Sequence, residues 1–353
     1  MTFSEGLSFQ SNNDGTCTIT GIGDCEDLVI NIPPTSPEGD IVTVIGNEAF
    51  ADCVCIRSIT MPDSIIQIKD NAFEGCLGLD SITIPNSVTE IGCAVFGDCI
   101  NLTSIAIPDS ITEIDSYLFS GCRKLTSVTI PDSVTEIWMH AFSGCRKLTS
   151  VTIPDSVKVI GVHAFDGCKK LTSITIPNTV TEIMEGVFYG CSNLTSIAIP
   201  DSVTKIGKNA FYDCSSLTSV AIPESVTRIC EHAFDGCMNL FSITIPEGIT
   251  RIDRYTFHDC RNLTSVTLPE SVTRICDHAF DWCTNLKSIA FPKGLTRIGG
   301  YAFYGCRGLK SITIPESVVN IAEGAFQGCC NVEKVDVPES VTIGDYAFDF
   351  LNW

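Results

Sequence analysis

The chain has 353 residues, of which 44% are hydrophobic and 18% are charged, and its formal net charge is −20 at pH 7. This composition supplies enough apolar side chains for a packed core and excludes a disordered chain. The excess of acidic groups repels nucleic acid, so no nucleic-acid partner is expected. No run reaches the roughly 18 apolar residues of a membrane-spanning helix, and the N-terminal residues do not resemble a signal peptide, so no membrane insertion is expected.

A repeat of 23 residues organises the sequence. Proline recurs at this interval between residues 62 and 338, a phenylalanine follows 11 residues after each proline from Phe73 to Phe326, and a cysteine lies three residues after each of these phenylalanines. The unit reads L-T-S-I-T-I-P-D-S-V-T-E-I-G-x-x-A-F-x-G-C-x-N. One such unit has too little apolar surface to form its own core, so successive units must stack on one another.

Within a unit the apolar spacing predicts local structure. The L-x-x-V-x-I pattern of residues 148–153 predicts a short strand that ends at a proline, and Val157 and Ile160 predict a second extended segment. Residues 164–168 predict a turn or a single helical turn, and the Gly or Asp before each repeat cysteine suits a left-handed corner. Parallel stacking at about 4.8 Å would align the Ile, Phe and Cys of successive units as internal columns.

These repeats resemble the BspA-like class of leucine-rich repeats, also described as the Treponema pallidum type. The shared signature, I-P-x-S-V-T-x-I-G-x-x-A-F-x-G-C-x-x-L-T-S, covers residues 28–349. The resemblance implies a curved, right-handed leucine-rich-repeat solenoid with a parallel β-sheet on its concave face. The expected fold class is therefore an α/β-type repeat solenoid that is mostly β, with short helical turns. The resemblance also implies surface-exposed or secreted proteins with adhesion and protein-binding roles.

Two regions are expected along the chain. Residues 1–27 resemble an N-terminal capping hairpin that turns at residues 13–15, and residues 28–353 form a solenoid of about 14 coils of 23 residues. The first coil is longer, because Pro33 and Pro62 are 29 residues apart, and the last is one residue short, because Phe348 comes one residue early. Residues 349–353 are mostly apolar, and they either cover the last coil or precede further chain.

Thirteen of the 20 cysteines belong to the repeat column between Cys53 and Cys329. Parallel side chains about 4.8 Å apart do not match the facing Cβ atoms, about 3.8 Å apart, of a disulfide. The column is therefore predicted to consist of buried free thiols, and only Cys17 and Cys25 form a candidate bridge. Such thiols suit a reducing compartment, whereas the family resemblance implies the cell surface or secretion, and burial would also protect them outside the cell.

No catalytic or ligand-binding constellation is found. The motifs G-x-S-x-G, G-x-x-x-x-G-K and H-E-x-x-H do not occur, and there is no C-x-x-C pair. Among the five histidines only His140 and His163 fall in adjacent units at one repeat position. The sequence therefore predicts no enzyme, no cofactor and no metal site.

The predicted strand directs three polar side chains of each unit outward. These Thr and Ser residues either keep an exposed sheet soluble or form a hydrogen-bonding face for a partner. Regular rows of hydroxyl groups could also bind ice or a mineral surface, although a curved solenoid lacks the flat face that this requires. We call the following candidate partner-binding residues the Thr/Ser face: Thr126, Ser127, Thr129, Thr149, Ser150, Thr152, Thr172, Ser173 and Thr175.

Three consecutive units carry paired basic residues directly after the repeat cysteine. This set is either a solvated corner or a contact for an acidic protein segment or a sulfated glycan. It comprises Arg123, Lys124, Arg146, Lys147, Lys169 and Lys170, which we call the basic corner. Aromatic residues that could anchor a partner, or simply pack on their neighbours, are Trp138, Tyr189, Tyr212, Trp282 and Tyr304.

Two further columns carry charge. The column directly after the proline is acidic, as in Asp155 and Glu247, and its carboxylates either accept backbone N–H bonds in a turn or bind a cation. The column five residues after the proline changes sign along the chain, and its C-terminal arginines are expected to pair with the first column. Its charged members are Glu90, Glu113, Glu136, Glu182, Lys205, Arg228, Arg251, Arg274 and Arg297.

These observations predict a non-enzymatic binding or adhesion protein that presents its solenoid surface to a protein or glycan ligand. The alternatives are an intracellular scaffold of the same fold and an ice- or mineral-binding protein that uses the Thr/Ser face.

Overall fold

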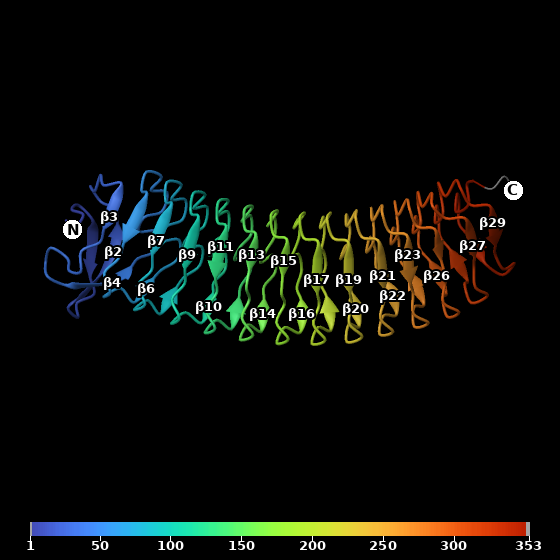
Figure 1. Ribbon diagram of the computed structural model, residues 1–353, viewed down its shortest axis with the longest axis horizontal. Coiled ribbons are helices and arrows are strands. Elements are labelled where there is room, and N and C mark those ends of the chain that lie inside the picture. Colours follow the sequence, from blue (N-terminus) through green and yellow to red (C-terminus); the bar gives the residue numbers. More distant parts are fainter. Residues whose placement is uncertain (1, 351–353) are drawn as a thin grey trace. The chain divides into compact units, whose positions relative to one another are not determined.

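The computed structural model describes residues 2–350 and is built from about 14 stacked coils (Figure 1). The chain divides into two compact units, Met1–Thr179 (unit 1) and Val180–Trp353 (unit 2), and each is described on its own below. Each coil of either unit carries two short strands joined by turns, and most equivalent strands of successive coils pair in parallel, in sheets of two to five strands. The predicted parallel repeat solenoid is confirmed.

A hairpin opens unit 1. Strand β1 (Ser8–Ser11) pairs antiparallel with β2 (Thr16–Gly21), and the turn between them contains Asn13 and Gly15, both with positive φ. Strand β2 then pairs in parallel with β4 of the first coil, so the hairpin and the first coils share one sheet. The boundary of a separate cap at residue 27 stays a prediction.

The strands before each proline form the first series. A central Ile or Val points into the core while the residues on either side of it are exposed, because alternate side chains of a strand face opposite sides. The members are β3 (Val29–Asn31), β5 (Ser58–Thr60), β7 (Ser81–Thr83), β9 (Ser104–Ala106), β11 (Ser127–Thr129), β13 (Ser150–Val151) and β15 (Ser173–Ile174) in unit 1, and β17 (Ser196–Ala198), β19 (Ser219–Ala221), β21 (Ser242–Thr244), β23 (Ser265–Thr267), β25 (Ser288–Ile289), β27 (Ser311–Thr313) and β29 (Lys334–Asp336) in unit 2.

The second series follows the proline and consists mostly of two-residue strands. Its isoleucine is buried in nearly every coil and the residue before it points outward. The members are β4 (Ile41–Ile45), β6 (Gln67–Ile68), β8 (Glu90–Ile91), β10 (Glu113–Ile114), β12 (Glu136–Ile137) and β14 (Val159–Ile160) in unit 1, and β16 (Glu182–Ile183), β18 (Lys205–Ile206), β20 (Arg228–Ile229), β22 (Arg251–Ile252), β24 (Arg274–Ile275), β26 (Arg297–Ile298), β28 (Asn320–Ile321) and β30 (Thr342–Ile343) in unit 2.

The phenylalanine column fills the centre of each unit. Neighbouring rings stack nearly parallel, with centroids between 5.1 and 5.7 Å apart, as for Phe326 with Phe348 and for Phe73 with Phe96. Most of these rings are fully buried. Their spacing follows from the strand spacing of about 4.8 Å, so the backbone pairing of the coils also sets the ring contacts.

The repeat cysteines form a second internal column, as predicted. They are free thiols, and from Cys76 onward they are buried. The thiol of Cys76 donates to the carbonyl oxygen of Phe50 at 3.0 Å, and the same contact recurs along both units, up to Cys329 with Phe303 at 3.3 Å. Burial raises the pKa of the Cys76 thiol to about 12. Cys17 and Cys25 are also free thiols, so the structure holds no bridge between them.

The corners between strands contain left-handed residues at two fixed positions. The position before each repeat cysteine has positive φ, as at Gly144 (φ 72) and Asp213 (φ 55), which confirms the predicted corner. The position two residues before each phenylalanine is left-handed as well, as at Asn71 (φ 56) and His140 (φ 55). Of the two possibilities for residues 164–168 the structure shows turns, and residues 2–350 contain no helix. Accordingly, no helix long and apolar enough to cross a membrane is found among these residues.

Replacement of Phe165 by Ala tests the phenylalanine column. The ring is fully buried and stacks on Phe142 at 5.3 Å, so its loss should leave a cavity and lower the free energy of unfolding by about 3–5 kcal/mol. Denaturant unfolding followed by circular dichroism measures this change. The matched control is Phe241→Ala, because the Phe241 side chain is 60% exposed and should contribute little. Equal losses in the two variants would contradict a ring column that stabilises the core.

Thiol labelling tests the cysteine column. Cys55 and Cys330 are exposed and should react with a thiol reagent in the native protein, whereas the buried column should react only after unfolding. Because burial raises the folded-state pKa of Cys76 from 9.0 to about 12, its stabilising contribution is present below pH 9 and is lost as the pH rises toward 12. Mass spectrometry of labelled peptides measures the pattern, and rapid native labelling of Cys145 would contradict it.

Candidate functional site

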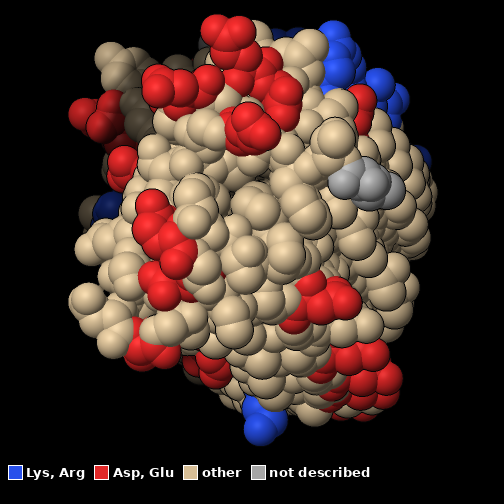
Figure 2. Space-filling model, turned by 90° about the vertical axis from the view of Figure 1, so that its left-hand side faces the viewer, with Lys and Arg blue, Asp and Glu red and all other residues tan. Residues whose placement is uncertain are grey.

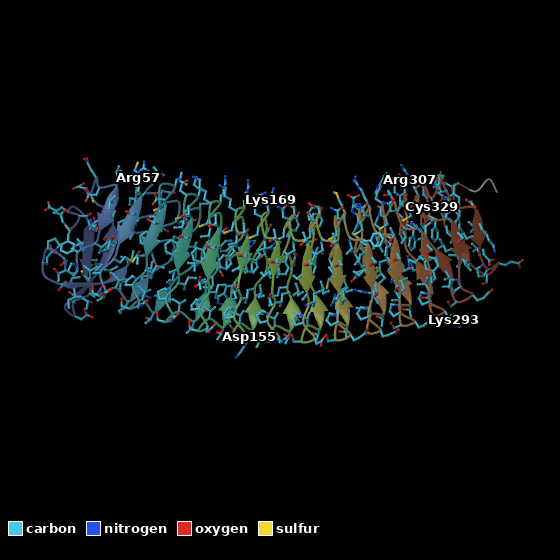
Figure 3. All side chains as sticks on the ribbon, in the orientation of Figure 1. Arg57, Asp155, Lys169, Lys293, Arg307 and Cys329 are labelled. Carbon is cyan, nitrogen blue, oxygen red and sulfur yellow. The ribbon has the colours of Figure 1, made fainter. Side chains whose placement is uncertain are left out.

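The basic corner lies in the turns that lead from the repeat cysteines to the first strand series of unit 1. All six side chains are exposed. The turn is held by backbone bonds such as Arg146 N–H to the carbonyl of Gly144, at 2.7 Å. Figure 3 shows Lys169 at one edge of the coils and Asp155 of the same unit at the opposite edge. Within residues 2–350 none of the six forms a salt bridge, so the corner is a concentration of positive charge without internal partners.

The Thr/Ser face adjoins the basic corner, because only one residue separates Lys124 from Thr126. The structure exposes all nine of its side chains. The first row is already hydrogen-bonded along the stack, since the Thr126 hydroxyl donates to the carbonyl of Thr103 at 3.1 Å and the Thr149 hydroxyl to that of Thr126 at 3.3 Å. This row therefore offers hydroxyl oxygens as acceptors to a partner, while its hydrogens remain within the ladder.

Acidic groups lie beside Arg123, the first residue of the basic corner. Figure 2 shows red carboxylates scattered over the face that it presents, and blue basic groups gathered mainly at its upper right. A hollow of about 530 Å³ is lined by Asp52, Glu74, Asp98 and Arg123, among others. Burial, together with the nearby carboxylates Asp98, Asp52 and Glu48, raises the pKa of Glu74. Within the described part of the chain, no group of three or more His, Cys, Asp or Glu side chains is arranged to hold a metal ion.

The aromatic candidates mostly pack on their neighbours. Tyr189 stacks on Tyr212 with centroids 4.6 Å apart, and Trp282 contacts the Tyr304 ring edge-on at 5.6 Å. The indole of Trp138 is 37% exposed and donates its Nε1 hydrogen to Glu113 Oε2 at 2.7 Å. Of the five, Trp138 in unit 1 therefore combines an exposed ring with a charged neighbour.

A ladder of aromatic rings in unit 2 was not anticipated from the sequence. His232, Tyr255, His278 and Tyr301 stack in this order, with centroid distances of 4.6, 4.6 and 5.3 Å. They occupy the left-handed position two residues before the phenylalanine, where all four residues have φ between 54° and 57°. In several other coils this position holds Asn or Gly, residues that tolerate positive φ, as His also does. That pattern in the sequence marks the position as a left-handed corner, where side chains of successive coils can stack.

Buried carboxylates next to this ladder bind histidine side chains. Asp235 accepts hydrogen bonds from Nδ1 of His232 at 2.8 Å and from Nδ1 of His258 at 2.7 Å. The hydrogen bond to Asp235 is the main cause that raises the pKa of His258. In unit 1, burial and the neighbouring His163 lower the pKa of His140. The repeat thus holds imidazoles in two opposite electrostatic environments.

The expected pairing between the arginine column and the acids after the prolines is wrong. Within residues 2–350 no salt bridge joins the two columns. Two of the acids instead accept backbone bonds from the next coil: Glu224 Oε2 from the Glu247 N–H at 3.2 Å, and Glu270 Oε2 from the Lys293 N–H at 3.1 Å. The two columns belong to different parts of the coil, because one lies in the turn and the other on a second-series strand.

Coils of 23 residues with parallel strand ladders define a leucine-rich-repeat solenoid. The sequence pattern described as BspA type leucine rich repeat region (6 copies) matches residues 43–171, 135–264 and 250–352. The chain belongs to this family of BspA type leucine-rich repeats. No curated protein matches the chain at a significant level.

Solved structures carry the same fold. The chain is similar to a leucine-rich repeat protein from Bacteroides ovatus, with 29% identity and a TM-score of 0.87 over 99% of this chain and 92% of that chain. It is also similar to a leucine rich cell surface protein from Faecalibacterium prausnitzii, with 30% identity and a TM-score of 0.61 over 98% and 94% of the two chains. The pneumococcal vaccine antigen PcpA shares the fold at 18% identity, with a TM-score of 0.52 over 97% of this chain and 92% of that chain.

The two types of histidine environment should be visible in a titration. We expect His258 to titrate above its ordinary pKa of 6.5 and His140 to titrate below it. Because the folded-state pKa of His258 is raised, the stability that it contributes is present below pH 6.5 and is lost as the pH rises through the folded value. Nuclear magnetic resonance of the ring protons measures both values. Asp235→Asn should lower the pKa of His258 and leave that of His140 unchanged, and a shift of both would contradict the assignment.

Proposed function

We propose that the chain is a non-enzymatic binding protein, and that unit 1 engages an acidic segment of a protein partner through the basic corner and the adjoining Thr/Ser face. The observation that carries the proposal is that the six basic side chains are exposed and form no salt bridge with any other residue of the described range 2–350. The chain belongs to the BspA type leucine-rich repeats, and the stacked coils of a repeat protein create an extended surface suited to binding another protein.

Electrostatics favour an acidic partner for this corner. Six cationic groups lie on three consecutive coils of a chain whose net charge is −20, so the corner differs in sign from most of the surface around it. An anionic segment is therefore steered to the corner and repelled elsewhere. Because the basic groups are exposed and unpaired, a partner does not have to break an existing salt bridge in order to bind them.

The neighbouring Thr/Ser face complements this contact. The Thr and Ser residues on and beside strands β11, β13 and β15 are exposed, and their hydroxyl oxygens accept hydrogen bonds. A partner segment can thus place carboxylates at the corner and backbone or amide N–H groups on the face. Display at the cell surface and a role in adhesion belong to the same proposal, supported by the cell surface relative from F. prausnitzii.

A charge reversal at the corner tests the proposal. We expect the protein to bind a synthetic glutamate-rich peptide, and Arg146→Glu with Lys147→Glu to weaken binding by at least about tenfold without changing the fold. Fluorescence anisotropy at low salt measures the affinity, and circular dichroism checks the fold. Heparin serves as a second probe, because a sulfated glycan is the competing ligand.

The control is Arg261→Glu with Asn262→Glu in unit 2, at the same repeat positions, which makes the net charge more negative by three where the corner reversal makes it more negative by four. Arg261 occupies the same repeat position as Arg146, but its guanidinium is already bound to Asp259 at 2.6 Å. The control should leave peptide binding nearly unchanged. Equal effects of the two double variants, or tighter binding of heparin than of the peptide, would rule out a specific acidic protein site at the basic corner.

A further inference from the structure

The outward column of the second strand series forms two ladders of opposite charge. Unit 1 carries Glu90, Glu113 and Glu136, which we call the acidic ladder. Unit 2 carries Arg228, Arg251, Arg274 and Arg297, which we call the arginine ladder. Both sets lie on second-series strands, with Glu113 directly beside Glu136 and Arg274 directly between Arg251 and Arg297.

Within each ladder the neighbouring charges repel one another. Like charges opposite each other on paired strands are destabilising, and the strands here are about 4.8 Å apart. Where neighbouring coils carry opposite signs, the same column forms a salt bridge, as between Glu182 and Lys205 at 3.0 Å. Among the described residues the ladders themselves have few partners, since Arg251 binds Asp253 at 3.0 Å and Glu113 accepts the Trp138 indole hydrogen.

We propose that the acidic ladder of one copy of this chain docks on the arginine ladder of a second copy. The two ladders share one spacing, because each step along either of them is one coil. Read from 90 to 297 in steps of 23, the column is Glu, Glu, Glu, Val, Glu, Lys, Arg, Arg, Arg, Arg. An antiparallel arrangement of the two ladders brings Glu90 to Arg297, Glu113 to Arg274 and Glu136 to Arg251.

A second observation adds an aromatic contact to this surface. Trp138 follows β12 on the coil of Glu136, and its exposed ring lies beside the acidic ladder. In unit 2 the strand pairing is interrupted between β20 and β22, and a hollow of about 460 Å³ opens there. It is lined by Thr227, Arg228, Ile229, Ile249, Thr250 and Arg251.

Matching Glu136 with Arg251 brings Trp138 to this hollow. The indole face can then cover a guanidinium, a contact that is favourable and common at protein interfaces. Neither the repeat nor the strand pairing requires a tryptophan at position 138, where other coils carry residues such as Gly161 and Gly92. The aromatic anchor and the charge pattern therefore point to the same partner surface.

Sedimentation velocity of the full chain over a range of concentrations tests the proposal. We expect self-association that weakens as the ionic strength rises from about 0.01 M to about 1 M, because the screening length falls from roughly 30 Å to roughly 3 Å. One reversal variant is Glu113→Arg with Glu136→Arg, and the other is Arg251→Glu with Arg274→Glu. Each alone should raise the dissociation constant by at least about tenfold, because one ladder then meets its own sign.

Mixing the two reversal variants is the decisive measurement. In the mixture the two reversed positions of each variant face positions of opposite charge in the other variant, so association should return as a complex that contains both variants. The control is Lys287→Glu with Lys310→Glu, which changes the net charge as much as the arginine reversal but lies beside the first strand series of unit 2. Trp138→Ala should weaken self-association, and circular dichroism checks that each variant folds.

Several results would overturn the proposal. A chain that stays monomeric at low salt and high concentration has no such interface. Self-association that both reversal variants retain uses another surface, and a mixture of the variants that fails to associate shows that the ladders do not meet. Loss of association in the Lys287 and Lys310 control to the same extent would show that net charge, rather than ladder pairing, governs the behaviour.

Discussion

Parallel pairing between successive coils is the constraint on which the rest of the molecule depends. One coil exposes strands of two or three residues and a single ring, far too little to form a core, so its stability comes from the coil before and the coil after it. Pairing at about 4.8 Å places each side chain over its counterpart. The stacked rings, the thiol–carbonyl bonds and the hydroxyl bonds of the first Thr row are all consequences of this one spacing.

The same spacing acts differently inside and outside the coil. Identical apolar side chains attract one another when stacked, so the inward positions tolerate uniformity and retain Phe, Ile, Leu and Cys. Identical charges repel, so an outward position at which neighbouring coils carry the same charge is one where a partner of opposite charge finds unsatisfied groups. The basic corner and the arginine ladder are both of this kind, whereas Glu224 and Glu270, two of the acids after the prolines, accept bonds from backbone N–H groups of the next coil.

The features that recur in every coil could be predicted from sequence, because repetition converts spacing along the chain into position in space. The Phe165 ring, the Cys145 thiol and the left-handed Gly144 follow directly from the period. The ring ladder at His232 and the partners of the arginines did not follow. Those depend on the orientation of the side chains at a corner and on which of several acids lies within reach, and a repeat pattern specifies neither.

Stacking also limits what evolution of this surface can change. A large-to-small substitution at an inward position leaves a cavity that removes packing contacts from both neighbouring coils. A substitution at an outward position changes the surface of one coil only. Units 1 and 2 accordingly share their Phe and Cys columns, whereas the same outward position is acidic at Glu113 in unit 1 and basic at Arg274 in unit 2. A binding surface on this fold is therefore assembled rung by rung, and its specificity lies in the order of residues along a column rather than in any one coil.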